Sequence, residues 1–297
     1  MLVHRPALSA AVLAAALTAA AAPLSAQWPK YRSASPPRGA DGSVNLLAPA
    51  PRTPAGTPDL SGVWENVGWR ELQQRSGDIS GTGGSPSTRA LLTGGPGLFF
   101  DIAAGVAGGL PLQPWAAELK RQRMAANSKD NPDAHCLPLG NLQLHTHPQP
   151  RKIIQTADVV VVLYEGNAGT RQLFTDGRSL PANDAQPWWF GYSTGRWVAD
   201  TLVVETAGFR DGGWLDVNGS PLTDRARTTE RYRRTSYGAM EVQVTVDDPK
   251  AYTRPWTPRN KMPLTLAPAN FDMMEMICSP TEVMEFRKTI SDRTSNR

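Results

Sequence analysis

The sequence predicts a mainly β protein: an antiparallel meander that closes into a barrel or a sandwich, with one short helix and long loops. After Pro150, apolar and polar residues alternate with the two-residue period of a strand, and many apolar positions hold β-branched or aromatic residues. Glycine, aspartate and asparagine separate these runs at nearly regular intervals, which favours short antiparallel strands over a parallel α/β fold. The expected strands are Lys152–Thr156, Val159–Glu165, Arg171–Thr175, Trp188–Trp197, Thr201–Thr206, Thr228–Thr235, Met240–Asp247, Lys261–Leu266 and Phe271–Ile277.

Short turn sequences support the meander. Each has the composition of a tight connection between antiparallel neighbours, so we expect most strands to pair with the next strand along the chain. The expected turns are Ala157-Asp158, Asp176-Gly177, Gly195-Arg196, Ala199-Asp200 and Tyr237-Gly238.

The N-terminus predicts a cleaved secretory signal. His4 and Arg5 precede an alanine-rich apolar stretch from Ala7 to Ala22, and Ser25-Ala26 provides small residues for cleavage. The stretch is shorter than the roughly 20 residues that a spanning helix needs, and no later run reaches that length. We therefore expect a periplasmic or secreted protein with no integral membrane segment after cleavage of residues 1–26.

The rest of the chain predicts one domain behind a tail. Residues 27–58 are rich in proline and alanine, as in a linker, and the β-compatible segment that opens the domain begins at Asp59. Residues 59–297 are the expected single β-rich domain, a size that barrels and sandwiches commonly reach. Within it, residues 76–109 predict a long loop, and the short helix follows Pro114, from Trp115 to Ala126.

The net charge indicates no nucleic-acid partner. Loss of Arg5 with the leader leaves 30 basic against 27 acidic residues, a formal charge of +3 in place of +4. Basic and acidic residues also alternate in the charged segments, as on an ordinary solvated surface.

Cys136 and Cys278 predict a disulfide, because export places both thiols in an oxidising compartment. Two alternatives fit less well. A metal site has no Cys-x-x-Cys spacing to support it, and a catalytic thiol would leave the second cysteine without a role.

Gly62-Val63-Trp64 resembles the Gly-x-Trp motif of lipocalin-like barrels. In those folds the tryptophan on the first strand closes one end of the barrel, and an arginine from a late strand packs over it. The resemblance implies that Arg231, Arg233 or Arg234 takes this place here.

Nearly the whole expected mature chain also resembles a large family of secreted bacterial proteins of unassigned function. The segments that carry the likeness are Asp59–Trp64, Gly195–Trp197, Asp200–Thr206 and Asp247–Trp256.

The chain departs from that family at positions that could carry chemistry. Members often have an acidic Glu-Gly-Asp-Thr after Gly-Arg-Trp, where this chain reads Val198-Ala199-Asp200. They also often have a histidine where Tyr192 stands and Pro-His-Ser where Pro221-Leu222-Thr223 stands. Histidine chemistry in the family therefore does not carry over to Tyr192 or Leu222.

His145 and His147 are the one close histidine pair. On a strand they would share a face, as a metal site requires, and His135 or a carboxylate would supply a third ligand. Pro148 breaks the strand pattern, however, so we interpret the pair as polar residues of a loop or rim. Gly-x-Ser-x-Gly and an appropriately placed Gly-x-Gly-x-x-Gly are absent from the sequence, and we expect no metal or other cofactor.

Three carboxyl groups are candidates for acid/base chemistry. Asp211 and Asp216 flank Trp214 in a glycine-rich loop, where desolvation would raise a carboxyl pKa; the alternative is a solvated loop with capping aspartates. Glu230 would point to the opposite face of its strand from Arg231, into the barrel or into a cross-strand ion pair. The candidate catalytic set is Asp211, Asp216, Tyr192, His145 and Glu230.

A dense group of aromatic residues is the candidate binding wall. Such rings suit either a flat apolar ligand or an ordinary core. The proposed ligand-binding residues are Trp188, Trp189, Trp197, Phe209 and Trp214.

These observations predict an exported β-barrel protein that binds a small apolar or aromatic molecule. The alternative is an acid/base enzyme, a lyase, isomerase or hydrolase, that acts on such a molecule in the barrel mouth.

Overall fold

The computed structural model describes residues 36–67, 97–182, 186–258, 261–268, 270–279, 281, 283–285 and 287–288. The expected leader at residues 1–26 and much of the expected loop at 76–109 lie outside the described residues. Residues 36–44 belong to a separate unit, in which a β-bridge joins Arg38 to Val44. The helices and strands below belong to the unit that begins at Asn45.

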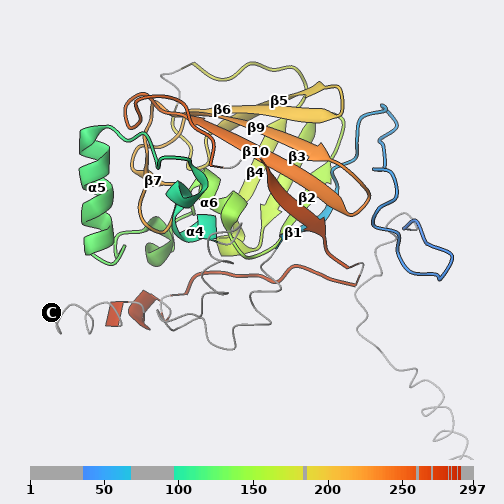
Figure 1. Cartoon of the computed structure of the whole chain (residues 1–297), viewed down its shortest axis with the longest axis horizontal. Helices are drawn as coiled ribbons and strands as arrows, with labels where there is room; N and C mark the ends of the chain where they lie inside the picture. Colours follow the sequence, from blue (N-terminus) through green and yellow to red (C-terminus); the bar gives the residue numbers. More distant parts are fainter. Residues whose placement is uncertain are drawn as a thin grey trace, which may run out of the picture. The chain divides into compact units, whose positions relative to one another are not determined.

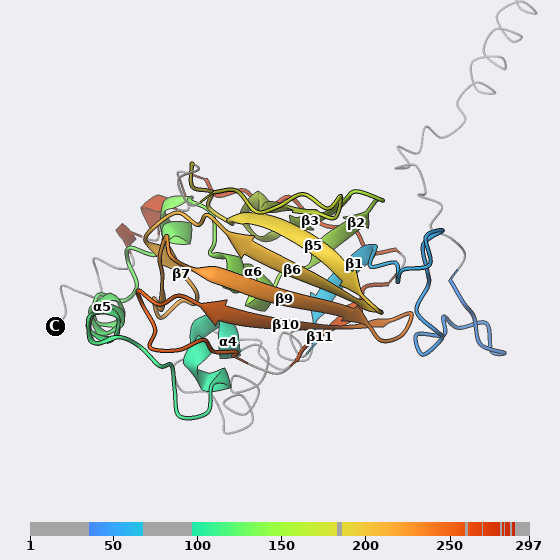
Figure 2. The ribbon, with the colours of Figure 1, turned by 90° about the horizontal axis from the view of Figure 1, so that it is seen from above.

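Nine strands form a closed barrel (Figures 1 and 2). Their order is β1, β11, β10, β9, β6, β5, β4, β3, β2, so β1 closes the ring between β2 and β11. The predicted mainly β fold is confirmed, and it is a barrel and not a sandwich. The barrel strands are β1 Gly62–Asn66, β2 Arg151–Gln155, β3 Val159–Tyr164, β4 Thr170–Phe174, β5 Tyr192–Val198, β6 Thr201–Ala207, β9 Arg227–Arg234, β10 Ala239–Asp247 and β11 Met262–Leu266.

One seam of the barrel breaks the meander. β4 and β5 run parallel and pair only at Leu173 with Ser193 and at Phe174 with Thr194, whereas the other neighbouring barrel strands are antiparallel. Between these strands the chain therefore crosses back to the end of the barrel at which β4 begins. A second interruption is the small sheet of β7, Gly213–Trp214, and β8, Pro221–Leu222, between β6 and β9.

Two of the expected tight turns are wrong, for different reasons. Asp176-Gly177 cannot join antiparallel neighbours because the strand that follows pairs in parallel, and the Asp176 carboxylate instead binds the Arg178 guanidinium at 2.6 Å. Gly195-Arg196 lies inside β5. The other three expected turns do join antiparallel strands.

Two expected strands also need correction. β5 begins only at Tyr192, and Trp188, four residues earlier, makes an isolated bridge to Phe209. Residues 271–277 form no strand, although most of them are apolar. A strand forms only where a neighbouring strand has free backbone N–H and C=O groups to pair with. The closed barrel has no free edge that could pair with this segment.

The alternation of β9 and β10 fixes which side chains fill the barrel. Every second residue of β9 from Thr228 to Arg234 is buried, and so is every second residue of β10 from Met240 to Val246. The register pairs Glu230 with Val204 of β6 on one side and with Val244 of β10 on the other. A polar residue is thereby placed among apolar inward-facing neighbours.

The helix α5 lies outside the barrel, whereas α6 lies among the barrel strands (Figures 1 and 2). The expected helix is confirmed as α5, with proline at its first position. Among the described residues, no helix is long and apolar enough to cross a bilayer. The helical segments are α4 Gly97–Phe100, η1 Ile102–Gly105, α5 Pro114–Ala125, η2 Pro132–His135, α6 Asn141–Thr146 and η3 Gly166–Ala168.

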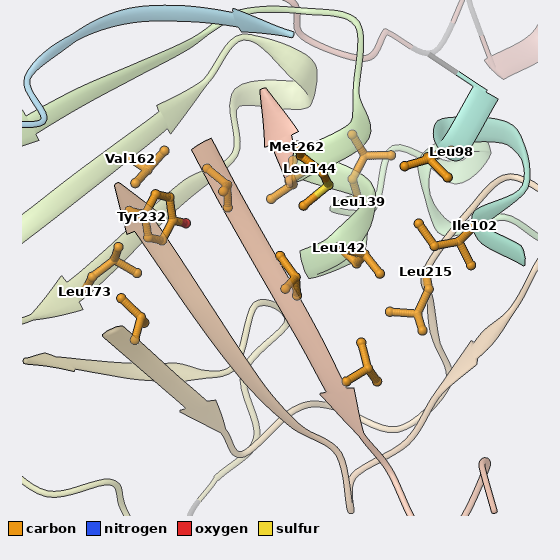
Figure 3. Packing of buried hydrophobic residues seen from close by; sticks show 14 of the residues in the cluster. Leu98, Ile102, Leu139, Leu142, Leu144, Val162, Leu173, Leu215, Tyr232 and Met262 are labelled. Atoms are coloured by element: carbon orange, nitrogen blue, oxygen red, sulfur yellow. The ribbon is translucent and has the colours of Figure 1, made fainter. Parts of the chain in front are cut away.

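The helix α6 is the main departure from the expected structure. We interpreted His145 and His147 as polar residues of a loop or rim, but His145 lies in the buried helix α6 and His147 ends the helix. All six residues of α6 are buried, and Figure 3 shows Leu142 and Leu144 among inward-facing barrel side chains such as Val162. The helix is too short to form by propensity alone, so its burial in the barrel stabilises it.

The other end of the barrel is closed by a tryptophan and an arginine. Trp64 is fully buried, and its Nε1 donates a hydrogen bond to the carbonyl oxygen of Leu60 at 3.0 Å. The guanidinium of Arg234 lies 4.9 Å from the centre of the Trp64 ring and donates to the carbonyl oxygen of Asp59 at 2.6 Å. Arg231 and Arg233, the other two candidates, face outward.

The predicted disulfide between Cys136 and Cys278 is confirmed, which rules out the free thiol and the cysteine metal site. It joins residues 142 positions apart and attaches the C-terminal segment to the loop after η2.

The approach of Gly140 to Trp214 tests the placement of α6. Gly140 precedes the helix with φ −66° and ψ 155°, and a Cβ atom there would lie 1.7 Å from the Trp214 carbonyl oxygen. We expect Gly140→Ala to lower the free energy of unfolding by at least about 1–3 kcal/mol, because the backbone has to move. Gly169→Ala is the matched control, since Gly169 has φ −62° and ψ 137° and a Cβ would only reach ordinary contacts at 3.5 Å. Urea denaturation of both variants measures the difference, and equal stability would contradict the placement.

Candidate functional site

A buried polar network crosses the barrel interior at Glu230. The Glu230 side chain is fully buried. Its carboxylate accepts hydrogen bonds from Arg171 Nη2 at 2.7 Å and from Arg171 Nη1 at 3.1 Å. His145 Nε2 lies 3.0 Å from the same carboxylate, and the Tyr232 hydroxyl donates to it at 2.6 Å. Asn141 of α6 adds a longer contact at 3.3 Å. The network thus joins β9, β4 and α6.

The network also holds the parallel seam from inside. Arg171, on β4, donates through Nη2 to Ser193 Oγ of β5 at 3.2 Å. Ser193 Oγ in turn lies 2.8 Å from Thr206 Oγ1 of β6. These side-chain bonds supplement the two backbone residue pairs of the β4–β5 seam.

The electrostatics of the network favour an ionised glutamate and a neutral histidine. Burial alone would raise the pKa of Glu230, but the charge of Arg171 and the hydrogen bonds it receives hold this pKa well below its usual range. Burial lowers the pKa of His145, opposed by Glu230 and assisted by the positive charges of Arg171 and Arg151. A neutral His145 donates from Nε2, because a carboxylate only accepts.

The cavity that reaches His145 among the described residues is too small for an organic substrate. This cavity beside His145 measures about 10 Å³, close to the volume that a single water molecule needs. Its walls include Asn66, Leu98 and Met262, and the His145 side chain is only 1% exposed. The pair of predicted residues His145 and Glu230 is therefore brought together, but inside a filled barrel.

The three other candidate catalytic residues lie apart from this pair. The carboxylate of Asp216 is fully buried and accepts from Ile102 N, Ser220 N and Ser220 Oγ, each at 2.8 Å. Burial raises the pKa of Asp216, against the charge of Lys120 3.8 Å away. Asp216 therefore joins η1 to the loop after β7. Asp211 is exposed and pairs with Lys250 at 3.3 Å, and the Tyr192 hydroxyl accepts from Arg178 at 3.0 Å.

The predicted aromatic wall is divided among several environments. Trp214 is buried under the guanidinium of Arg123, 4.4 Å from the ring centre, and Phe209 is also buried. Trp197 packs at the margin of the core, and Trp189 lies near Arg210, whose guanidinium is 5.1 Å from its ring.

Trp188 belongs to a surface cluster outside the β4–β5 seam. The centre of its ring lies 5.2 Å from that of Tyr192, which stacks on Phe174 at 5.2 Å. The guanidinium of Arg178 lies over the Phe174 ring, 3.9 Å from its centre. These rings and Arg178 therefore pack on one another at the short parallel seam.

The three histidines that were considered as possible metal ligands are separated. His135 is exposed, with Nε2 2.9 Å from the carbonyl oxygen of Lys129. His147 points away from His145, and its ring makes an edge contact with Phe99 at 5.0 Å between centres. Among the described residues, no cluster of three or more histidine, cysteine or acidic side chains could hold a metal ion.

The described residues form a much larger cavity outside the barrel, of about 420 Å³. Its walls come from α4, from the turns after α5, from η2 and η3, and from the C-terminal segment that the disulfide attaches. We call it the side pocket. Its lining residues are Phe99, Phe100, Asn127, Ser128, Asn131, Asp133, Ala134, Asn167, Val217, Met276, Cys278 and Val283.

Several side-pocket residues have an uncommon backbone conformation. Asn127, Ser128 and Asn167 are in the left-handed region, with φ of 53°, 54° and 51°. Asparagine adopts this conformation more readily than most residues other than glycine, and it is common in turns. The sequence signal for the pocket was therefore the turn-forming run from Asn127 to Asp133, which the sequence analysis did not single out.

Asp133 is the acidic side chain among the described lining residues. Its pKa is raised by burial, an effect that a hydrogen bond from Asn167 Nδ2 at 3.3 Å partly opposes. Asn167 Nδ2 also donates to the carbonyl oxygen of Leu137 at 3.0 Å. No lysine, arginine or histidine occurs among the lining residues that the structure describes.

No protein-family model matches the chain, and no curated protein matches its sequence. The geometry of the side pocket and of the buried network therefore has to indicate the function.

The Glu230–Arg171 pair yields a test of the network. Glu230→Gln leaves the Arg171 charge buried without a counter-ion, so we expect it to cost about 3–5 kcal/mol of unfolding free energy. Arg171→Met should cost a similar amount, and the double variant less than the sum, because it removes both charges. Urea denaturation of the cycle measures this coupling, with Glu118→Gln in the exposed pair with Arg121 as the control. Additive losses would contradict the role given to the pair.

His147 yields a test by pH. Its pKa falls to about 3, chiefly through burial, whereas an unfolded histidine titrates near 6.5. Between these pH values the unfolded chain binds a proton that the folded chain does not, so stability falls as the pH falls, by about 1.4 kcal/mol per pH unit. We expect His147→Gln to reduce the loss of stability between pH 6 and pH 4 by that slope. Unfolding free energies across this range measure it, and an unchanged slope would refute the assignment.

Proposed function

We propose that this chain is an exported binding protein for a small, largely apolar molecule, and that the molecule binds in the side pocket. The observation that carries the proposal is the pocket itself. Its volume of about 420 Å³ lies within the roughly 300–1,000 Å³ typical of small-molecule sites. Its walls combine apolar side chains with a few hydrogen-bonding groups, which is the usual composition of such sites.

The construction of the pocket supports binding of a defined ligand. The disulfide fixes Cys278 in the wall, and the adjoining Asn167 side chain is held by its bonds to Asp133 and to the Leu137 carbonyl oxygen. Walls that are already positioned lose less conformational entropy when a ligand binds. The barrel then serves as the scaffold on which these loops are held.

The geometry favours binding over the acid/base enzyme. A reaction at His145 and Glu230 needs a substrate within hydrogen-bond reach of both, and the cavity beside His145 is of about 10 Å³. Asp211, Asp216 and Tyr192 make contacts elsewhere in the fold. The enzyme stays the alternative prediction.

Two features support the exported, lipocalin-like part of the proposal. A disulfide is typical of proteins in oxidising compartments, which agrees with the expected leader. The packing of Arg234 over Trp64 follows the arrangement that the resemblance to lipocalin-like barrels implies. Lipocalins hold a ligand inside the barrel, whereas here α6 occupies that space, so the proposed site lies outside.

A bulky side chain in the pocket wall tests the proposal. Ala134 lines the pocket, so Ala134→Trp should fill much of it and weaken binding of the neutral apolar fluorophore N-phenyl-1-naphthylamine at least tenfold. Ala125→Trp places the same side chain on the exposed end of α5 and should bind the fluorophore like the unaltered protein. Fluorescence titration measures both affinities, and thermal unfolding checks that the variants are folded. Equal binding by both variants, or no binding by the unaltered protein, would overturn the proposal.

A further inference from the structure

We propose that the side pocket selects organic cations, namely amines with an apolar body, whose ammonium group binds against Asp133. This inference rests on the proposed function and names the chemical class of the ligand. It follows from the distribution of charge, aromatic rings and amide groups around the cavity.

The first step is the unbalanced charge of Asp133. Its carboxylate has a hydrogen bond from the Asn167 amide and no salt bridge among the described residues. The neighbouring Asp130, in contrast, is exposed and paired with Lys129 at 2.8 Å. A partly buried carboxylate that has lost part of its hydration gains more from a cation than an exposed, paired one does.

The second step is the aromatic part of the wall. Phe99 and Phe100 meet edge to face, with ring centres 5.2 Å apart, and Phe100 is 37% exposed. The face of a phenylalanine ring attracts a cation that lies within about 6 Å of the ring centre. The same rings, with Val217 and Met276, provide the apolar surface for the body of the ligand.

The third step is the hydrogen-bonding group that the Asn167 side chain leaves free for a ligand. Asn167 Nδ2 is engaged by Asp133 and by the Leu137 carbonyl oxygen, so this amide has only its oxygen left to offer a ligand. An ammonium group has donors alone and suits a carboxylate together with an amide oxygen. A carboxylate ligand would meet Asp133 with the same charge and would find no cation among the described lining residues.

Competition among three ligands of nearly equal shape tests the inference. 1-Naphthylmethylammonium, 1-naphthylmethanol and 1-naphthoate differ chiefly in charge, and each is titrated against bound N-phenyl-1-naphthylamine at pH 7. We expect the ammonium compound to displace the fluorophore with at least tenfold higher affinity than the alcohol, and the carboxylate to bind more weakly than the alcohol. Equal affinities of amine and alcohol would overturn the charge selection while leaving the pocket as a binding site.

Two variants assign the selectivity to Asp133. Asp133→Asn should remove the preference for the ammonium compound over the alcohol. Asp130→Asn removes the same charge from the exposed pair with Lys129 and should preserve the preference. A preference that survives in Asp133→Asn refutes the inference. The comparison of ligands on the unaltered protein decides it even if that variant does not fold. Failure of the fluorophore itself to bind would instead refute the proposed function.

Discussion

Burial of the Glu230 carboxylate in the barrel is the constraint on which the rest of the structure depends. An ion removed from water loses several kcal/mol of hydration, and only a close counter-charge with further hydrogen bonds offsets that loss. Arg171 supplies the charge, and His145 and Tyr232 supply the bonds. Because these groups come from β4, from α6 and from β9, one carboxylate fixes the parallel seam, the helix inside the barrel and the register of the central strands.

The filled barrel determines where a ligand can bind. The helix α6 occupies one end of the interior, and Trp64 with Arg234 closes the other. The segment before the helix and the loop at η3 lie outside. The Cys136–Cys278 disulfide attaches the C-terminal segment to the former, and a hydrogen bond from Met274 N to Glu165 Oε2 at 2.9 Å attaches it beside the latter. A rigid barrel that holds short loops around an apolar cavity is a common way to build a binding site. Here the proposed binding surface lies beside the barrel and not within it.

The chemistry of individual residues predicted only part of the candidate site. His145 and Glu230 were both selected from the sequence, and they do meet at 3.0 Å, yet in a sealed interior. Asp216 was selected because it is near Trp214, and it proved to bind backbone amides and Ser220. The side pocket was missed because its walls are far apart in the chain, from Phe99 to Val283, and no local pattern links them.

The sequence by itself determined the strand pattern, the helix after Pro114 and the pairing of the two cysteines, because alternation, helix start signals and cysteine count are local or compositional properties. Tertiary structure alone decided that the sheet closes as a barrel, that β4 and β5 run parallel and that residues 271–277 form no strand. It also decided that Asn141–Thr146 is a helix. Each of these features depends on which backbone and side-chain groups remain available for pairing in the folded molecule. The intrinsic helix propensity of a six-residue segment is too weak to determine its conformation, so tertiary packing determines it.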